Sequence, residues 1–227
     1  MRFEKIDQQC IDSVFGYIRN AQKLFINDKR IYYTIPISIN HICALYYASY
    51  FDKFYKWSIG KRMILSKNKL TIIQKKTGFN SAFLTKIIDR GVYHWIFRLD
   101  VVSIPGVWST TIGIFDSDEQ DDDDDYPINK RFLEGYEKGY GWSPCNAKLI
   151  NTKTGICKKD DKDYGIKCDQ GDIIEMFVDM NKLELSYVVN GQDFGVAFKI
   201  RDSYYQAAIN LFCTGDSITL LLALRIA

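Results

Sequence analysis

The stretch GDIIEMFVDMNKLELSYVVNGQDFGVAF, residues 171–198, decides the fold class of this chain. Apolar residues recur at every second position of its first segment, and those on one strand face are Ile174, Met176 and Val178. Residues 179–182 then allow the chain to reverse. Asn190-Gly191 is the dipeptide that best adopts positive φ at both central positions of a type I′ turn. The stretch therefore predicts three consecutive antiparallel strands.

Similar short runs, rich in β-branched and aromatic residues, extend on both sides of this stretch from Phe54 onward. Glycine, asparagine and aspartate separate them. The predicted strands are Arg62–Leu65, Thr71–Gln74, Gly91–Leu99, Thr111–Phe115, Lys148–Asn151, Ile173–Asp179, Leu183–Val189, Gly195–Phe198, Tyr205–Asn210 and Ser217–Ala223. So many short strands with almost no helix predict a mainly β chain folded as an antiparallel β-sandwich.

The first fifty residues have a different pattern. Apolar side chains recur at helical spacing over residues 7–23. A second apolar helical face follows Thr34 and Pro36, which suit the start of a helix. We therefore expect a short helical pair in a segment 1–52, followed by one β-sandwich domain over residues 53–227.

Several short motifs occur in a fixed order along residues 91–219. They are Gly91-Val-Tyr-His-Trp95, Ile112-Gly-Ile114, Gly139-Tyr-Gly-Trp142, Gly171-Asp-Ile-Ile174, the run LSYVVNGQDFGVAF at 185–198, Tyr204-Tyr-Gln-Ala-Ala208 and Gly215-Asp-Ser-Ile-Thr219. Together they resemble the SPRY family. One departure is the order of Tyr93 and His94, which the family commonly reverses. Another is the insertion DSDEQDDDDDYPINK at 116–130, which is longer and more acidic than the family requires.

The resemblance implies a bent sandwich of two antiparallel sheets, similar to concanavalin-type lectins. It also implies that loops at one end bind a peptide segment or a partner surface, without catalysis. The turn Phe212-Cys213-Thr214 matches the place where several family members present ligand-contacting residues. Tyr126 and Pro127 follow the acidic run, where an exposed tyrosine offers contact area at little entropic cost. We expect the two loops to act jointly, with the partner-binding residues Tyr126, Pro127, Phe212, Cys213, Thr214, Asp122, Asp123 and Asp124.

The net charge of +2 hides two segments of opposite charge. Eight acids and no base lie between Asp116 and Asp125, whereas ten bases and one acid lie between Lys53 and Arg90. The acidic run lacks the spaced ligands and glycine turn of an EF-hand, so a solvated loop is the first interpretation. The functional interpretation is a loop that attracts a basic partner by electrostatic steering. A nucleic-acid or anionic-membrane surface on the basic stretch is a minor alternative.

The N-terminal segment has a weaker resemblance to a second family. Ile35-Pro36, leading into an apolar run that ends at Leu45-Tyr-Tyr47, resembles the start of an F-box, whose helices dock on a ubiquitin-ligase scaffold. The other interpretation, which we prefer, is a helical lid that packs on the sandwich. The chain is therefore expected to be a protein-binding module, with a substrate-adaptor role as one form of it and lectin-like binding of glycans or small ligands as the alternative.

The residues needed for catalysis are sparse. The chain has only two histidines, and neither a nucleophile elbow nor a phosphate-cradling glycine loop is present. The six cysteines form no CxxC pair, which argues against a zinc site and favours free thiols. We expect no enzyme activity, cofactor or metal. No apolar run is long enough to cross a bilayer, so a cytoplasmic protein is expected, with its oligomeric state left open.

Overall fold

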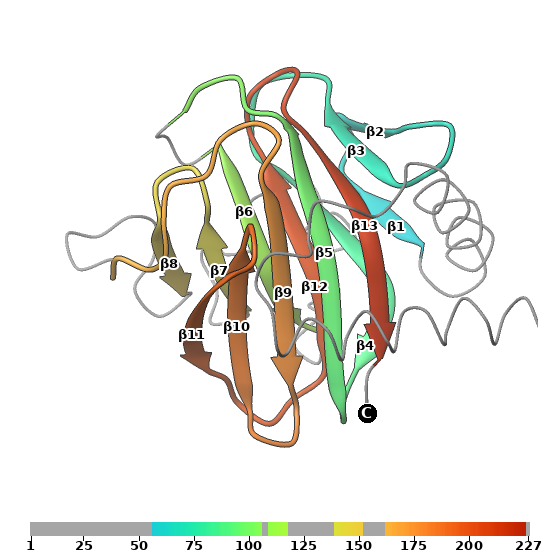
Figure 1. Ribbon diagram of the computed structural model, residues 1–227. Coiled ribbons are helices and arrows are strands. Elements are labelled where there is room, and N and C mark those ends of the chain that lie inside the picture. The colour runs from blue at the N-terminus through green and yellow to red at the C-terminus, as the bar shows by residue number, and fades with distance from the viewer. Residues whose placement is uncertain (1–55, 106–108, 118–138, 152–161, 226–227) are drawn as a thin grey trace, which may run out of the picture. The chain divides into compact units, whose positions relative to one another are not determined.

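The computed structural model describes residues 56–105, 109–117, 139–151 and 162–225, which form a sandwich of two antiparallel β-sheets (Figure 1). The strands in these residues are β1 (Trp57–Ile59), β2 (Met63–Leu65), β3 (Thr71–Gln74), β4 (Asn80–Ile88), β5 (Val92–Val101), β6 (Thr110–Asp116), β7 (Gly139–Ser143), β8 (Lys148–Asn151), β9 (Ile173–Asp179), β10 (Glu184–Val189), β11 (Gln192–Lys199), β12 (Tyr205–Leu211) and β13 (Ser217–Arg225). The predicted mainly β fold is confirmed. The predicted helical pair in segment 1–52 lies outside the described residues.

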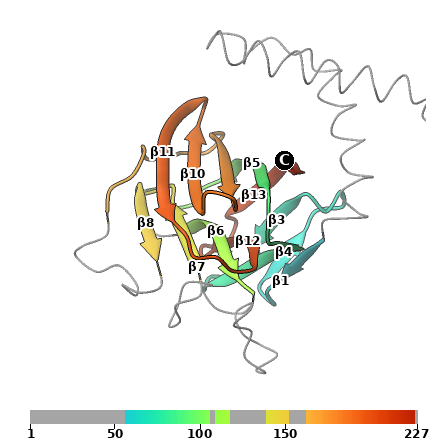
Figure 2. The ribbon, with the colours of Figure 1, turned by 90° about the horizontal axis from the view of Figure 1, so that it is seen from below.

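The strand order is β1-β4-β12-β6-β7-β8 in the first sheet and β11-β10-β9-β5-β13-β3-β2 in the second. Figure 2 shows the two sheets from below as facing layers. The last two strands of the chain lie inside the sheets rather than at their edges. β12 runs between β4 and β6, and β13 runs between β5 and β3.

The meander of β9, β10 and β11 follows the turn chemistry of its sequence. Asn190 and Gly191 have φ values of 48° and 81°, as a type I′ turn requires. In the preceding turn, the Asp179 carboxylate accepts hydrogen bonds from the backbone N–H groups of Asn181 and Lys182, both at 3.0 Å. The predicted inner face of β9 is fully buried and consists of Ile174, Met176 and Val178.

The structure corrects the prediction in two places. Strands β1, β4 and β7 had not been predicted. In addition, simple alternation along β11 would place Phe194, Val196 and Phe198 on one face, but Val196 is 46% exposed. Two register shifts flank Val196, one between Leu185 and Ser186 and one opposite Tyr187, where Gly195 has a φ of 73°, and together they turn Val196 outward.

The two sheets are joined in the core by a cluster of three aromatic side chains. The rings of Trp142 and Tyr187, from opposite sheets, lie 5.2 Å apart, and Tyr164 packs edge-on against both. The Tyr187 hydroxyl donates a hydrogen bond to the backbone oxygen of Ile112 at 2.9 Å. The Tyr164 hydroxyl donates to the backbone oxygen of Gly195 at 2.6 Å. The hydroxyls of Tyr187 and Tyr164 thus both find backbone partners.

Two glycines of the sequence motifs allow β6 and β7 to approach closely. Gly113 lies directly opposite Gly141 in the pairing of these strands. A Cβ atom at position 113 would lie only 2.0 Å from the backbone oxygen of Tyr140. Glycine is therefore needed at position 113, because no side chain fits there against the backbone of β7.

Replacement of Tyr187 by Phe should lower the free energy of unfolding by about 1–2 kcal/mol at neutral pH, because the Ile112 carbonyl loses its donor. Burial raises the pKa of Tyr187 well above 10 and that of Tyr164 to about 12. In the unfolded chain both pKa values return to about 10, so unfolding releases protons above that pH and stability falls as pH rises further.

Urea unfolding at about pH 8.5 and about pH 11 measures this dependence. The loss of stability between the two pH values should be smaller in Tyr187→Phe than in the parent protein, because one buried phenol has been removed. Tyr204→Phe is the control, since the Tyr204 side chain is 48% exposed. Equal losses in Tyr187→Phe and the parent would show that Tyr187 does not control alkaline stability.

Candidate partner-binding site

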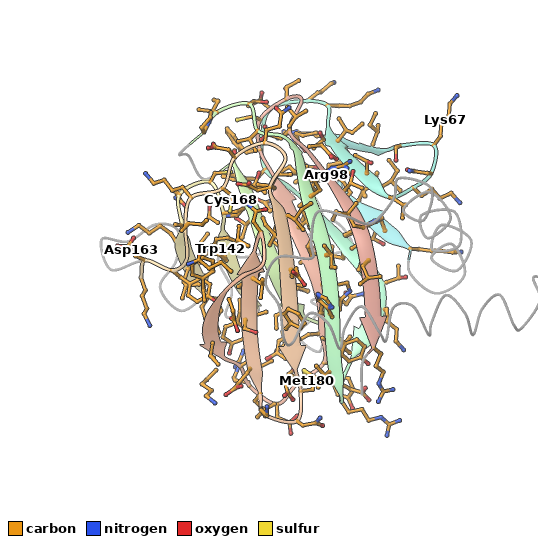
Figure 3. All side chains as sticks on the ribbon, in the orientation of Figure 1. Lys67, Arg98, Trp142, Asp163, Cys168 and Met180 are labelled. Atoms are coloured by element: carbon orange, nitrogen blue, oxygen red, sulfur yellow. The ribbon has the colours of Figure 1, made fainter. Side chains whose placement is uncertain are left out.

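The loops of the sandwich gather at two opposite ends of its strands. We name as the Phe212 end the segments 60–62, 75–79, 102–105 and 212–216. The Tyr204 end consists of the segments 89–91, 180–183 and 200–204. In Figure 1 the Phe212 end is at the top. Figure 3 shows Met180 at the lower end and Arg98 toward the upper end.

The two loops that the sequence predicted as one site leave the first sheet at opposite ends. Asp116, where the acidic insertion begins, lies opposite Tyr205 at the start of β12. Thr110 lies opposite Leu211, the residue before Phe212. The two points are separated by the length of β12, about 20 Å. The predicted residues Tyr126, Pro127, Asp122, Asp123 and Asp124 lie outside the described residues.

Asp216 fixes the connection between β12 and β13. Its side chain is fully buried, and its two carboxylate oxygens accept hydrogen bonds from the backbone N–H groups of Ser103 at 2.7 Å and Cys213 at 3.1 Å. The Ser103 hydroxyl donates in turn to the backbone oxygen of Thr214 at 3.2 Å. The N–H group of Gln74 donates to the Asp216 carbonyl at 2.9 Å. The segments 102–105 and 212–216 and the end of β3 are therefore held together.

Two phenylalanines meet on this frame. The rings of Phe79 and Phe212 have centroids 4.5 Å apart and are tilted by 48°, and both side chains are partly exposed. The hydroxyls of Thr77 and Thr214 are hydrogen bonded at 3.0 Å, and the N–H group of Gly78 donates to the Phe212 carbonyl at 2.9 Å. The 75–79 loop, which the sequence had not grouped with the Phe212 turn, thus packs against it.

The three predicted residues of this turn have different environments. Phe212 is partly exposed, Thr214 is exposed, and Cys213 is buried with 6% of its surface accessible. Burial, with a smaller contribution from the Asp216 carboxylate, raises the pKa of the Cys213 thiol. Cys213 therefore supports the turn from inside, whereas Phe212 and Thr214 face outward together with Ile104, which is 50% exposed.

Basic side chains flank the aromatic pair. Lys75, Lys76 and Arg62 are exposed, and the Lys75 N–H group donates to the Arg62 carbonyl at 2.7 Å. A Cβ atom on Gly78 would lie 1.8 Å from Nη1 of Arg62, so the guanidinium lies directly against the glycine. The sequence had shown the basic stretch but not its position, because the strand that follows residue 79 had not been predicted.

His94 lies away from this end, on the outer face of the second sheet. Its Nε2 is 2.9 Å from Oε2 of Glu175, and its ring stacks on Phe177 with centroids 4.0 Å apart.

Within the described ranges, no three His, Cys, Asp or Glu side chains are grouped so that they could hold a metal ion. The same ranges contain no helix long and apolar enough to cross a membrane.

Replacement of Asp216 by Asn should lower the free energy of unfolding by about 1–3 kcal/mol, because an amide NH₂ would face one of the two N–H donors. Hydrogen exchange should become faster at the amides of Ser103 and Cys213. Asp202→Asn, at an exposed residue of the Tyr204 end, is the control. Unchanged exchange rates at both amides would show that the Asp216 carboxylate does not hold these two N–H groups.

Comparison with solved structures shows the same architecture in known SPRY domains. The SPRY domain of human HERC1 matches with a TM-score of 0.55 and 15% identity, covering 73% of this chain and 93% of that one. A human SPRY domain matches with a TM-score of 0.50 and 14% identity, covering 70% and 94%. The PSpry domain of TRIM65 matches with a TM-score of 0.53 and 12% identity, covering 73% and 90%. At these identities the likeness establishes the fold.

The family itself is shown by sequence. The family model of the SPRY domain matches residues 94–225, more than half of the chain. The match includes β12, β13 and the turn that joins them, as the motifs had indicated. SPRY domains are general protein-interaction modules. This chain belongs to the SPRY domain family.

Proposed function

We propose that this chain binds a partner polypeptide through the Phe212 end of its sandwich. The observation that carries the proposal is the partly exposed pair of Phe79 and Phe212, whose loops are joined by the Thr77–Thr214 and Gly78–Phe212 hydrogen bonds. Asp216 in turn holds the Phe212 turn to the segment 102–105. Aromatic side chains are enriched among the residues that dominate binding energy in protein interfaces. A loop that is already ordered loses little conformational entropy on binding, so more of the contact energy is retained as affinity.

Phe212→Ala should lower the affinity for a partner peptide by about tenfold or more, because it removes the central apolar contact. Thr214→Arg is a second variant, since Thr214 is exposed and the added bulk should block the same surface. Ile87→Ala is the matched control, because Ile87 is 47% exposed on β4 near the opposite end. Peptides selected by display on the full chain are measured by fluorescence anisotropy, and each variant's melting temperature is recorded.

The proposal fails if Phe212→Ala and Thr214→Arg both bind selected peptides as tightly as the parent protein. The lectin-like alternative makes the opposite prediction about ligand class. A glycan array with clear hits, alongside a display selection that enriches no peptide, would support it. Peptide enrichment with an empty glycan array supports the recognition of polypeptides.

The acidic insertion is proposed as a second contact, through Tyr126, Pro127 and the aspartates Asp122, Asp123 and Asp124. A basic partner is the charge complement of this run, and its binding would weaken as salt rises. Because the insertion leaves the sheet at the Tyr204 end, this contact is proposed as separate from the Phe212 turn. Tyr126→Ala should then change the binding free energy independently of Phe212→Ala.

The adaptor role requires a further contact, for which residues 1–52 are the proposed segment. The motif around Ile35-Pro36 is the reason, because it resembles the start of an F-box. We place the protein inside the cell, as is usual for SPRY domains. Proximity labelling in the native cell should lose ubiquitin-ligase components when residues 1–52 are removed. An unchanged set of labelled partners contradicts the adaptor role and leaves the sandwich as the interacting part.

A further inference from the structure

We infer that the segment recognised at the Phe212 end is acidic as well as apolar, so that its carboxylates contact Arg62, Lys75 and Lys76 while an apolar side chain packs on Phe212. This inference rests on the proposed function and specifies the chemistry of the partner. It differs from the basic partner expected for the acidic insertion, which leaves the sandwich at the other end.

The charge of this end is strongly one-sided. Its four segments contain four bases, which are Lys61, Arg62, Lys75 and Lys76. The only acid in the same segments is Asp216, whose carboxylate is fully buried and hydrogen bonded to backbone N–H groups. The nearest acid on the adjoining strand, Asp100, is paired with Arg98 at 2.6 Å. Within these four segments, the exposed surface therefore carries bases without an exposed carboxylate.

Three of the bases are available to a ligand. Lys75, Lys76 and Arg62 are exposed, and none forms an ion pair with a carboxylate in the described part of the chain. Other bases behave differently, since Lys148 is paired with Asp163 at 2.6 Å. Unpaired bases can exchange water for a ligand carboxylate without first breaking an internal contact.

These bases are also held beside the aromatic pair by backbone contacts. The Arg62 carbonyl accepts from Lys75 N–H at 2.7 Å, and Gly78 N–H donates to the Phe212 carbonyl at 2.9 Å. The Arg62 guanidinium lies against Gly78, where a Cβ atom would leave it no room. A planar guanidinium in this position can donate two parallel hydrogen bonds to a carboxylate.

The arrangement favours a peptide over a nucleic acid. Single-stranded nucleic acids are bound where bases stack on aromatic faces along a basic groove. Here Phe79 and Phe212 are tilted against each other by 48° with centroids 4.5 Å apart, so each covers part of the other's face. Ile104, which is 50% exposed on the segment 102–105 of the same end, offers apolar contact of the kind that a peptide side chain uses.

The test is a peptide-display selection on the full chain, followed by affinity measurements with the most enriched peptide. We expect the enriched sequences to combine Asp or Glu with a large apolar residue. The double variant Lys75→Glu/Lys76→Glu should lower the affinity by about tenfold or more and reduce its dependence on salt. Lys86→Glu/Arg90→Glu is the matched control, with the same change in net charge on exposed residues toward the other end of β4. It should bind like the parent.

The outcomes separate this inference from the proposed function. Enriched peptides without acidic residues, or binding that Phe212→Ala abolishes but Lys75→Glu/Lys76→Glu leaves unchanged, would overturn the acidic partner alone. Binding that none of these variants affects would overturn the Phe212 end as the site. A labelled single-stranded oligonucleotide that binds more tightly than the enriched peptide, and loses affinity in Lys75→Glu/Lys76→Glu, would assign the bases to nucleic acid.

Discussion

Strands β12 and β13 each lie between two other strands of their sheets, so neither sheet is continuous until the last part of the chain has paired. Tyr205 lies opposite both Ile88 and Asp116, and Ser217 lies opposite both Ile73 and Val101. Each of these pairs joins segments that are far apart in sequence. Since such contacts require long loops to close first, folding is expected to be slower than that of helical domains of similar size.

The connection between these same two strands carries the proposed binding surface. Phe212 follows the last residue of β12 directly, and Asp216 immediately precedes β13. The surface is therefore positioned by two strands that are paired on both sides. The acidic insertion has a different origin, because it links β6 and β7, which are neighbours in the first sheet. The two proposed contacts thus differ in both charge and structural support.

Local sequence was sufficient to predict those parts of the fold that depend on local chemistry. The type I′ turn at Asn190-Gly191 and the buried face of β9 are examples, since turn residues and alternation act over a few positions. β4 was missed because buried residues occupy both faces of its first half and Lys86 interrupts its second half. β7 was missed because its glycines resemble a turn, although they allow close approach to β6.

The candidate site was less predictable than the fold. The Phe212 turn could be chosen because a family motif marks it, but the sequence could not show which other loops share its end. That relation depends on the strand order, which places residues 75–79 beside residues 212–216. For the same reason the acidic insertion was grouped with the Phe212 turn, although the insertion begins at the opposite end of β12.

The short connection between β12 and β13, residues 212–216, also limits how the binding surface can change during evolution. Its length is fixed, because the carboxylate of Asp216 must reach both Ser103 and Cys213. New specificities at this end would therefore arise by exchange of outward side chains, such as those at positions 212 and 214, within a loop of constant length. Related chains should differ here in residue type, and differ in loop length where β6 joins β7.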